Sequence, residues 1–386
     1  MKVIQGTREC APSEVGYDET RLDAVNGFFQ CMIDNKVIHG VSYRLARNGK
    51  VFASAALGSR HYKKSDVLLK PETNFRIASQ TKMFAAFAIQ LLVEDGLLSV
   101  EDKVADYLPQ FDSAPYNEIT ITHLLTHTSG LSPEGSIPDK YRTGAWEFIE
   151  EQAKIDGLNT DWLAAGLKCG LRRPPGTEWQ YCSFGTVILG AVITKLTGIN
   201  CEKFILDRIC KPLRMDSTTF DPSYEALNNG VIFDKYTEDE IKNTKKKNNE
   251  KSVWDDVPRV GGGLYSNTAD LIRFGIMMSQ WGQYDGVRII GRKAIESMIE
   301  QRLFNIPNFC WGANDNDRRY GLGVDLRRFP GSLTSVGTYF HEGAGHSVMI
   351  IDPVEKMVCS CVYPWVKDWD AACNGRLSNV IWSGLI

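Results

Sequence analysis

A serine and a lysine that stand three residues apart are the pair in this sequence best suited to chemistry. They are Ser79 and Lys82 in the stretch NFRIASQTKM (74–83), which precedes an apolar run and contains the only S-x-x-K in the chain. Side chains three positions apart share a helix face, so the lysine amine can reach the serine hydroxyl. Free backbone N–H groups at the start of a helix favour the negative charge that develops when the serine attacks. Apolar neighbours disfavour the charged ammonium form of the lysine. The pair can therefore act as nucleophile and base. The alternative is a serine at a helix start and a lysine that extends to solvent.

The elements that must position this pair are mixed helices and strands. Apolar spacing predicts a helix over 17–35 with Asp18 as N-cap, and an apolar, buried helix over 82–96 that stops at Gly96. Asn48-Gly49 between two β-prone runs predicts a hairpin over 41–58. Two strands follow at 346–363 and an amphipathic helix at 366–386, whereas the charged run 234–251 reads as a solvated loop.

The order of these patterns predicts the fold class. Strand patterns lie at both ends of the chain and helical patterns in the middle, which indicates an α+β protein. We expect one antiparallel sheet formed by both termini and flanked by helices, with an inserted mainly helical domain. The expected boundaries are 1–72 and 255–386 for the discontinuous sheet domain and 73–254 for the helical domain, with the active site at their interface.

Five segments carry a resemblance to a known family. They are 71–111, which includes the S-x-x-K, then ITITHLLTHTSGL, PPGTEWQYCSFGTVILGAVITKLTG, GGGLYSNTADLIRF and YGLGVD. In this order they resemble signatures of the serine β-lactamase-like family of penicillin-recognising enzymes, from about Val41 to Val362. The nearest branch is that of class C β-lactamases, family VIII carboxylesterases and related D-peptidases and acyltransferases. The resemblance implies a β-lactamase/transpeptidase-like fold.

The second family element is a Y-x-N motif, which YCSFG matches only in part. The resemblance implies that Tyr181 shares proton transfer with Lys82, although a buried aromatic with a satisfied hydroxyl is the structural alternative. Ser183 stands where the family has asparagine; it can donate a hydrogen bond but reaches less far. The histidines of HLLTHTSGL, His123 and His127, are interpreted as structural residues that shape the loop.

The third family element is K-T-G on a strand edge, and it aligns with His341, Glu342 and Gly343. A histidine at this place is common in the esterase and peptidase branches. We expect Gly343 to let the substrate lie close along the strand. The N–H groups of Ala344 and Ser79 are expected to form the oxyanion hole. The alternative for His341 is a polar residue at the end of a strand.

Together these residues predict a serine hydrolase that works through an acyl-enzyme without metal or organic cofactor. His341 is only partly charged at neutral pH and Glu342 should repel an anion, so an anionic substrate is disfavoured. Aromatic residues near the motifs suggest a pocket for a largely uncharged group: Trp179, Phe184, Tyr339 and Phe340. We therefore expect a carboxylesterase-like enzyme acting on a small ester or amide. A β-lactamase, a D-amino-acid peptidase or amidase, an acyltransferase and a non-catalytic binding protein of the same fold remain alternatives.

The composition of the chain limits the classes of partner that the protein is expected to bind. A net charge of −3 offers no basic field for nucleic acid, and no apolar segment is long enough to span a bilayer. The N-terminus shows no secretory signal, so we expect a cytoplasmic protein with ten reduced cysteines. Cys359 and Cys361 alone are a weak metal signal. The sequence does not indicate an oligomeric state.

Overall fold

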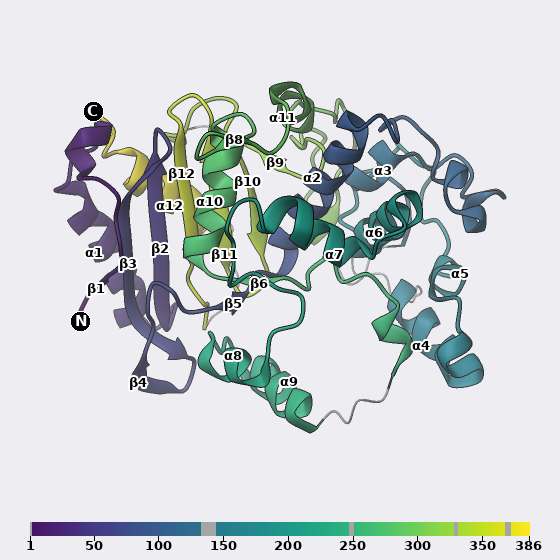
Figure 1. The fold of residues 1–386 in the computed structure, drawn as a ribbon, viewed down its shortest axis with the longest axis horizontal. Coiled ribbons are helices and arrows are strands. Elements are labelled where there is room, and N and C mark those ends of the chain that lie inside the picture. Colours follow the sequence, from purple (N-terminus) through teal and green to yellow (C-terminus); the bar gives the residue numbers. More distant parts are fainter. Residues whose placement is uncertain (1, 133–143, 247–250, 328–330, 367–371) are drawn as a thin grey trace.

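An antiparallel sheet built from both ends of the chain forms one side of the fold, on the left in Figure 1. The computed structural model describes residues 2–132, 144–246, 251–327, 331–366 and 372–386. Within them the sheet has eight strands in the order β1-β3-β2-β12-β11-β10-β9, with β4 paired to β3. The strands are β1 (Ile4–Gln5), β2 (Gly40–Arg47), β3 (Lys50–His61), β4 (Lys64–Leu68), β9 (Asp325–Leu326), β10 (Tyr339–Gly343), β11 (Ser347–Asp352) and β12 (Met357–Val362).

The two ends of the chain meet where β12 pairs with β2, with Cys361 opposite Tyr43. β2 and β3 form the predicted hairpin, and both turn residues, Asn48 and Gly49, have positive φ angles of 52° and 82°. Only a turn of this kind matches the twist of two directly connected strands. The hairpin and the two C-terminal strands expected from the sequence are thus confirmed.

Helices cover both faces of the sheet. α1 (Arg21–Asp34) and α12 (Ala372–Trp382) pack on one face, and α10 (Thr268–Ser279) packs on the other. The predicted N-terminal helix is confirmed, but Asp18 is not its N-cap. The helix starts after Thr20, whose N–H and hydroxyl both donate to Asp18 Oδ1 at 2.9 and 2.7 Å. The predicted C-terminal helix is found at α12, whereas residues 367–371 of that prediction lie outside the described residues.

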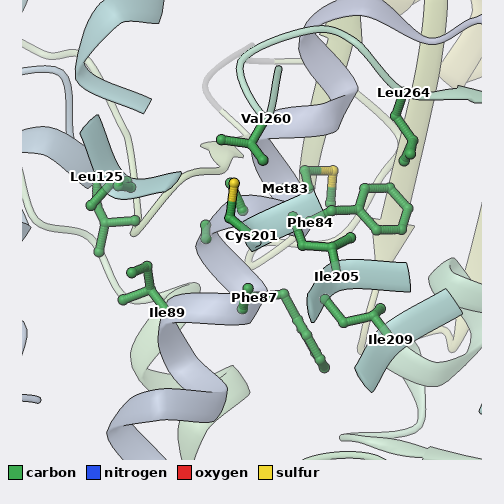
Figure 2. Close-up of a cluster of buried hydrophobic side chains, with 14 of the residues drawn as sticks. Met83, Phe84, Phe87, Ile89, Leu125, Cys201, Ile205, Ile209, Val260 and Leu264 are labelled. Carbon is green, nitrogen blue, oxygen red and sulfur yellow. The ribbon is translucent and has the colours of Figure 1, made fainter. Parts of the chain in front are cut away.

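The helix that follows Ser79 is α2 (Thr81–Glu94), and it is buried almost all round. Figure 2 shows apolar side chains of α2, among them Met83, Phe84 and Phe87, surrounded by side chains from other segments. Those labelled in the figure are Leu125, Cys201, Ile205, Ile209, Val260 and Leu264. Gly96 has a φ of 70° directly after the helix, as a C-terminal glycine does. The helix that carries Lys82 is therefore fixed by packing on every side.

The middle of the chain is mainly helical, which confirms the predicted fold class. The core around α2 continues into both the helical region and the sheet, and β5 pairs with β6 between them. The domain boundaries stay a prediction. The remaining elements are α3 (Ile121–Leu125), α4 (Ala145–Asp156), α5 (Trp162–Leu167), α6 (Ser183–Thr197), α7 (Cys201–Ile205), α8 (Tyr224–Asn229), α9 (Lys235–Lys246), α11 (Arg292–Met298), β5 (Phe75–Arg76), β6 (Tyr265–Ser266), β7 (Gln283–Tyr284) and β8 (Val287–Arg288).

The charged run 234–251 is not the solvated loop that its composition predicts. It forms α9, and the remainder at 247–250 lies outside the described residues. Ile241 is buried on this helix, and Glu238 accepts a hydrogen bond from Tyr62 and lies 3.1 Å from Lys242. Glu240 pairs with Arg76 at 3.3 Å. One apolar anchor and contacts to distant residues therefore stabilise a helix that is otherwise polar.

A membrane-spanning helix must have sufficient length and a sufficiently apolar composition. No single helix among the described residues meets both requirements. The segments Ser183–Thr197 and Cys201–Cys210 meet them only together, and they are bent by 82° relative to each other.

Candidate active site

Ser79 lies in a single 3-10 turn (Ala78–Gln80) directly before α2. The preceding residue, Ala78, has a φ of 46°, a conformation that costs a non-glycine residue about 1–3 kcal/mol. The turn is held by neighbouring segments, since the Ile77 N–H donates to Leu264 O at 3.0 Å and Ser347 Oγ donates to Ile77 O at 3.2 Å. Backbone strain that neighbouring segments hold in place is common at functional sites. Here the strained residue directly precedes the serine.

Lys82 is the second residue of α2, and its side chain contacts the serine. Its Nζ donates to Ser79 Oγ at 3.1 Å and to Gly261 O at 2.6 Å. The residue is only 2% exposed. When the amine loses a proton, it can keep its N–H bond to the carbonyl and accept the hydrogen of the serine hydroxyl. The predicted pair is thus brought together in a geometry suited to proton transfer.

Tyr181 lies on the other side of Lys82. The Lys82 Nζ is 4.9 Å from the centroid of the tyrosine ring. The Tyr181 N–H donates to Cys310 Sγ at 3.2 Å, and its ring lies 4.5 Å from that of His127 and 5.2 Å from that of Trp311, between centroids. Three neighbours therefore fix the tyrosine beside the lysine.

The two histidines of the loop contact main-chain groups. His127 Nδ1 accepts from the Cys182 N–H at 3.4 Å, and His123 Nδ1 accepts from the Thr120 N–H at 3.1 Å. His127 thus supports the segment that carries Tyr181, in keeping with the structural role expected for it.

Successive residues of β10 point to opposite faces of the sheet, which separates the members of the third motif. His341 faces Lys82 and is 3% exposed. Glu342 points to the opposite face, where its carboxylate accepts a hydrogen bond from Asn374 Nδ2 on α12. The expectation that Glu342 repels anions from the site is therefore wrong.

Gly343 packs closely against the main chain that precedes the nucleophile. A Cβ atom at this position would lie 2.1 Å from Ile77 O and 2.5 Å from Ser347 Oγ. A glycine is required here because β10 approaches the backbone of Ile77, two residues before Ser79. Its role in bringing the substrate close to the strand stays a prediction.

Ser79 borders a cleft of about 1170 Å³. Ser183 and Ala344 also border it, so three predicted site residues share one cleft, whereas His341 and Gly343 are buried and do not border it. The aromatic residues expected to line the pocket are buried elsewhere: Trp179, Phe184, Tyr339 and Phe340. Other aromatic residues take their place: Trp146, Phe220, Phe233, Tyr236, Trp254 and Tyr265. An aromatic cleft was therefore predicted with the wrong residues.

Comparison with known families shows to which family this chain belongs. The sequence model of the Beta-lactamase family matches residues 25–363. The chain belongs to the Beta-lactamase family. As a member it is a serine hydrolase, and the family predicted from the motifs is confirmed.

Several proteins share this family scaffold along their whole length. A Salmonella heidelberg (strain SL476) protein described as "Putative D-alanyl-D-alanine carboxypeptidase" is 24% identical over 412 residues, which cover 97% of this chain and 90% of that protein. A family VIII carboxylesterase has a TM-score of 0.76 at 19% identity, over 100% of both chains. A penicillin-binding protein homologue from Caulobacter crescentus has a TM-score of 0.73 at 19% identity, over 95% and 98% of the chains.

Two residues of this Beta-lactamase family site were missed by the sequence analysis. Gly261 supplies the carbonyl that binds Lys82, and three successive glycines (261–263) were a signal of close backbone approach. Cys310 supplies the sulfur that accepts the Tyr181 N–H across 129 residues of sequence. No local pattern marked Cys310, because its contact exists only in the folded chain.

Burial keeps the histidines around this family site neutral. Burial first, and the charge of Lys82 second, lower the pKa of His341 from 6.5 to about 4 and hold the pKa of His127 well below 6.5. Burial lowers the pKa of His346, in the turn after β10, to about 3. The position that carries a lysine in the family's K-T-G is therefore uncharged at neutral pH.

These neutral histidines predict that the protein loses stability in mild acid. The folded-state pKa of His346 lies below the unfolded value of about 6.5, so between those values the unfolded chain binds more protons. The free energy of unfolding should therefore fall as the pH drops below 6.5, by about 2 kcal/mol at pH 5 for each of His341 and His346. Urea unfolding at pH 7 and pH 5 measures this loss.

A matched variant isolates one histidine. His346 has a φ of 70°, which asparagine tolerates, so His346→Asn removes the titrating ring without new backbone strain. This variant should lose about 2 kcal/mol less than the wild type between pH 7 and pH 5. Equal losses in the two proteins would show that His346 does not titrate with a lowered pKa.

Proposed function

We propose that the protein is a carboxylesterase-like serine hydrolase that acts through an acyl-enzyme on a small, largely uncharged ester. The observation that carries the proposal is the contact of Lys82 Nζ with Ser79 Oγ at 3.1 Å, beside a cleft with aromatic walls. Amides of similar shape fit the same chemistry, since both react through attack on a carbonyl.

The proposed reaction begins with deprotonated Lys82. The amine takes the hydroxyl proton of Ser79 as its oxygen attacks the carbonyl carbon, and the Gly261 carbonyl keeps the amine oriented. The N–H groups of Ser79 and Ala344, whose residues border the cleft, stabilise the negative oxygen of the tetrahedral intermediate. Lys82 and Tyr181 then return the proton to the leaving group. Water completes the cycle by hydrolysing the acyl-enzyme, and no metal or organic cofactor takes part.

The charges along the cleft support an uncharged substrate. Among the residues that the structure describes, two cationic side chains line it, and both have carboxylate partners: Arg76 lies 3.3 Å from Glu240, and Arg259 lies 2.5 Å from Glu202 and 2.9 Å from Asp221. The buried His341 is neutral, as shown above. A carboxylate in this cleft would have to break an existing ion pair, which disfavours a penicillin or a peptide with a free C-terminus.

A D-alanyl peptidase is the second candidate, because the Salmonella relative that covers 97% of this chain is described as a carboxypeptidase of that kind. A β-lactamase and an acyltransferase on the same scaffold remain further alternatives. A purely binding role is disfavoured because Ser79, Lys82 and Tyr181 are all present and lie together. A cytoplasmic location stays part of the proposal, and the ten cysteines of the sequence are expected to be reduced there.

A three-substrate panel tests the proposal. We expect kcat/KM for p-nitrophenyl butyrate to exceed those for nitrocefin and for a peptide ending in D-Ala-D-Ala by on the order of tenfold or more, since a carboxylate without a partner loses about 1–3 kcal/mol. Hydrolysis of each is followed by product release at equal enzyme concentration. A preference for the peptide or for nitrocefin would refute the esterase assignment and establish the corresponding alternative.

A further inference from the structure

A second, smaller cavity adjoins the catalytic cleft. It has a volume of about 230 Å³ and is lined by residues of α8, α9, β5 and β6. Figure 1 shows where these four elements lie in the fold. The two cavities have six lining residues in common: Arg76, Asp221, Pro222, Leu227, Thr237 and Tyr265. One of them, Arg76, precedes Ser79 by three residues. The side cavity therefore adjoins the cleft that Ser79 borders, with these six residues common to both.

The deep wall of the side cavity is apolar. Phe75, Val231, Leu227 and Ile241 line it and are each no more than 9% exposed. Ile241 comes from α9, the helix that the sequence did not predict, so α9 supplies one of these four apolar residues. Water against such a surface is readily displaced by an apolar group.

Polar residues around the side cavity are bound to other protein groups. Asn74 Oδ1 accepts from Asn267 Nδ2 at 2.8 Å, and Thr237 Oγ1 donates to Asp234 at 2.9 Å. Ser223 Oγ accepts from the Ala226 N–H at 3.1 Å, and Arg76 pairs with Glu240. An apolar occupant therefore leaves these groups paired, whereas a charged occupant would have to compete for them.

The size of the cavity indicates a part of a ligand and not a whole one. Pockets that hold complete small ligands measure about 300–1,000 Å³, and the side cavity is smaller. In the proposed mechanism Lys82 and Tyr181 return the proton to the leaving group, and neither residue borders the side cavity. A group in the side cavity therefore belongs to the acyl part, which stays attached to Ser79.

We propose that the side cavity is an acyl-chain subsite and that the preferred substrates are esters of linear, medium-length fatty acyl groups. This inference rests on the proposed esterase function, since it names the acyl group of the same reaction. Each methylene that becomes buried favours binding about fourfold. The acyl chain is buried both in the bound substrate and in the transition state. The free energy gained from its burial should therefore raise kcat/KM.

The experiment compares p-nitrophenyl acetate and octanoate, below their micelle concentrations, on three proteins. Ala226 lines the side cavity and not the cleft, so Ala226→Phe fills only the subsite. Asn228 is exposed on the same helix and lines neither cavity, so Asn228→Phe is the matched control. The wild type and the control should favour octanoate by tenfold or more in kcat/KM. Ala226→Phe should lose that preference while its acetate hydrolysis stays within about twofold of wild type.

A binding measurement separates this proposal from the esterase proposal. Octanamide, which lacks the reactive ester, should bind the wild type saturably in calorimetry, acetamide should not, and Ala226→Phe should lose the binding. If acetate is hydrolysed but octanoate has no advantage, or if Ala226→Phe keeps that advantage, the subsite is wrong and the esterase stands. If no ester is hydrolysed, the esterase proposal fails, and octanamide binding alone decides whether the cavity takes an alkyl chain. Absence of that binding overturns the subsite.

Discussion

Ser79→Ala is expected to lower kcat/KM for p-nitrophenyl butyrate by on the order of 10⁴-fold or more. The variant lacks the oxygen that forms the covalent bond, and residues that act as one unit lose most of the acceleration together. An alkyl fluorophosphonate should add its phosphonyl mass to the wild-type peptide that contains Ser79, and no adduct should form in the variant. Mass spectrometry of the digested protein measures both.

The control for this variant is an exposed serine outside the cleft. Ser113→Ala changes the same atoms at such a position and should keep both the adduct and full turnover. Equal thermal unfolding of the two variants excludes misfolding as the cause of a loss. Turnover by Ser79→Ala at the wild-type rate would end the acyl-enzyme mechanism on this residue.

The nucleophile and base could be predicted from the sequence because their contact is local. Three positions along a helix suffice to bring Lys82 to Ser79, and the structure needs only one turn and the start of α2 to do so. The burial of α2 could also be predicted from the sequence, because a helix that is apolar on all sides has no polar face to expose to solvent. The antiparallel sheet followed from strand patterns at both termini.

Side-chain direction on β10 could also have been predicted and was not. Alternation along a strand requires adjacent residues to point to opposite faces, so His341 and Glu342 cannot both face the substrate. The same rule sends Phe340 to the face covered by α1 and α12. Composition near a motif is therefore a weaker guide to a pocket than the period of the element that carries it.

Other parts of the site depend on contacts that no local pattern encodes. Cys310 contacts Tyr181 from 129 positions away, and α9 depends on Tyr62 and Arg76 for its hydrogen bonds and ion pair. Because α9 supplies one wall of the cleft and of the side cavity, the error over 234–251 also hid the features that bear on substrate choice. Specificity was thus the least predictable property, since it arises where distant segments meet.

The remaining question of mechanism is whether Lys82 is a base or only a positive charge, and three variants answer it. Lys82→Arg keeps a charge that cannot release its proton at any workable pH, whereas Lys82→Met has a similar unbranched stem without charge. If the amine is the base, both variants should lose on the order of 10³-fold or more in kcat/KM and should lie within about threefold of each other. If Lys82 only stabilises charge, kcat/KM of the arginine variant should exceed that of the methionine variant by tenfold or more, and Tyr181 would be the sole base.

Lys103→Arg, at an exposed lysine paired with Glu118, serves as the control for the substitution itself and should leave turnover unchanged. Because Lys82 is only 2% exposed, the thermal midpoints of all variants must be measured as well, so that a loss caused by the larger guanidinium is not read as lost proton transfer.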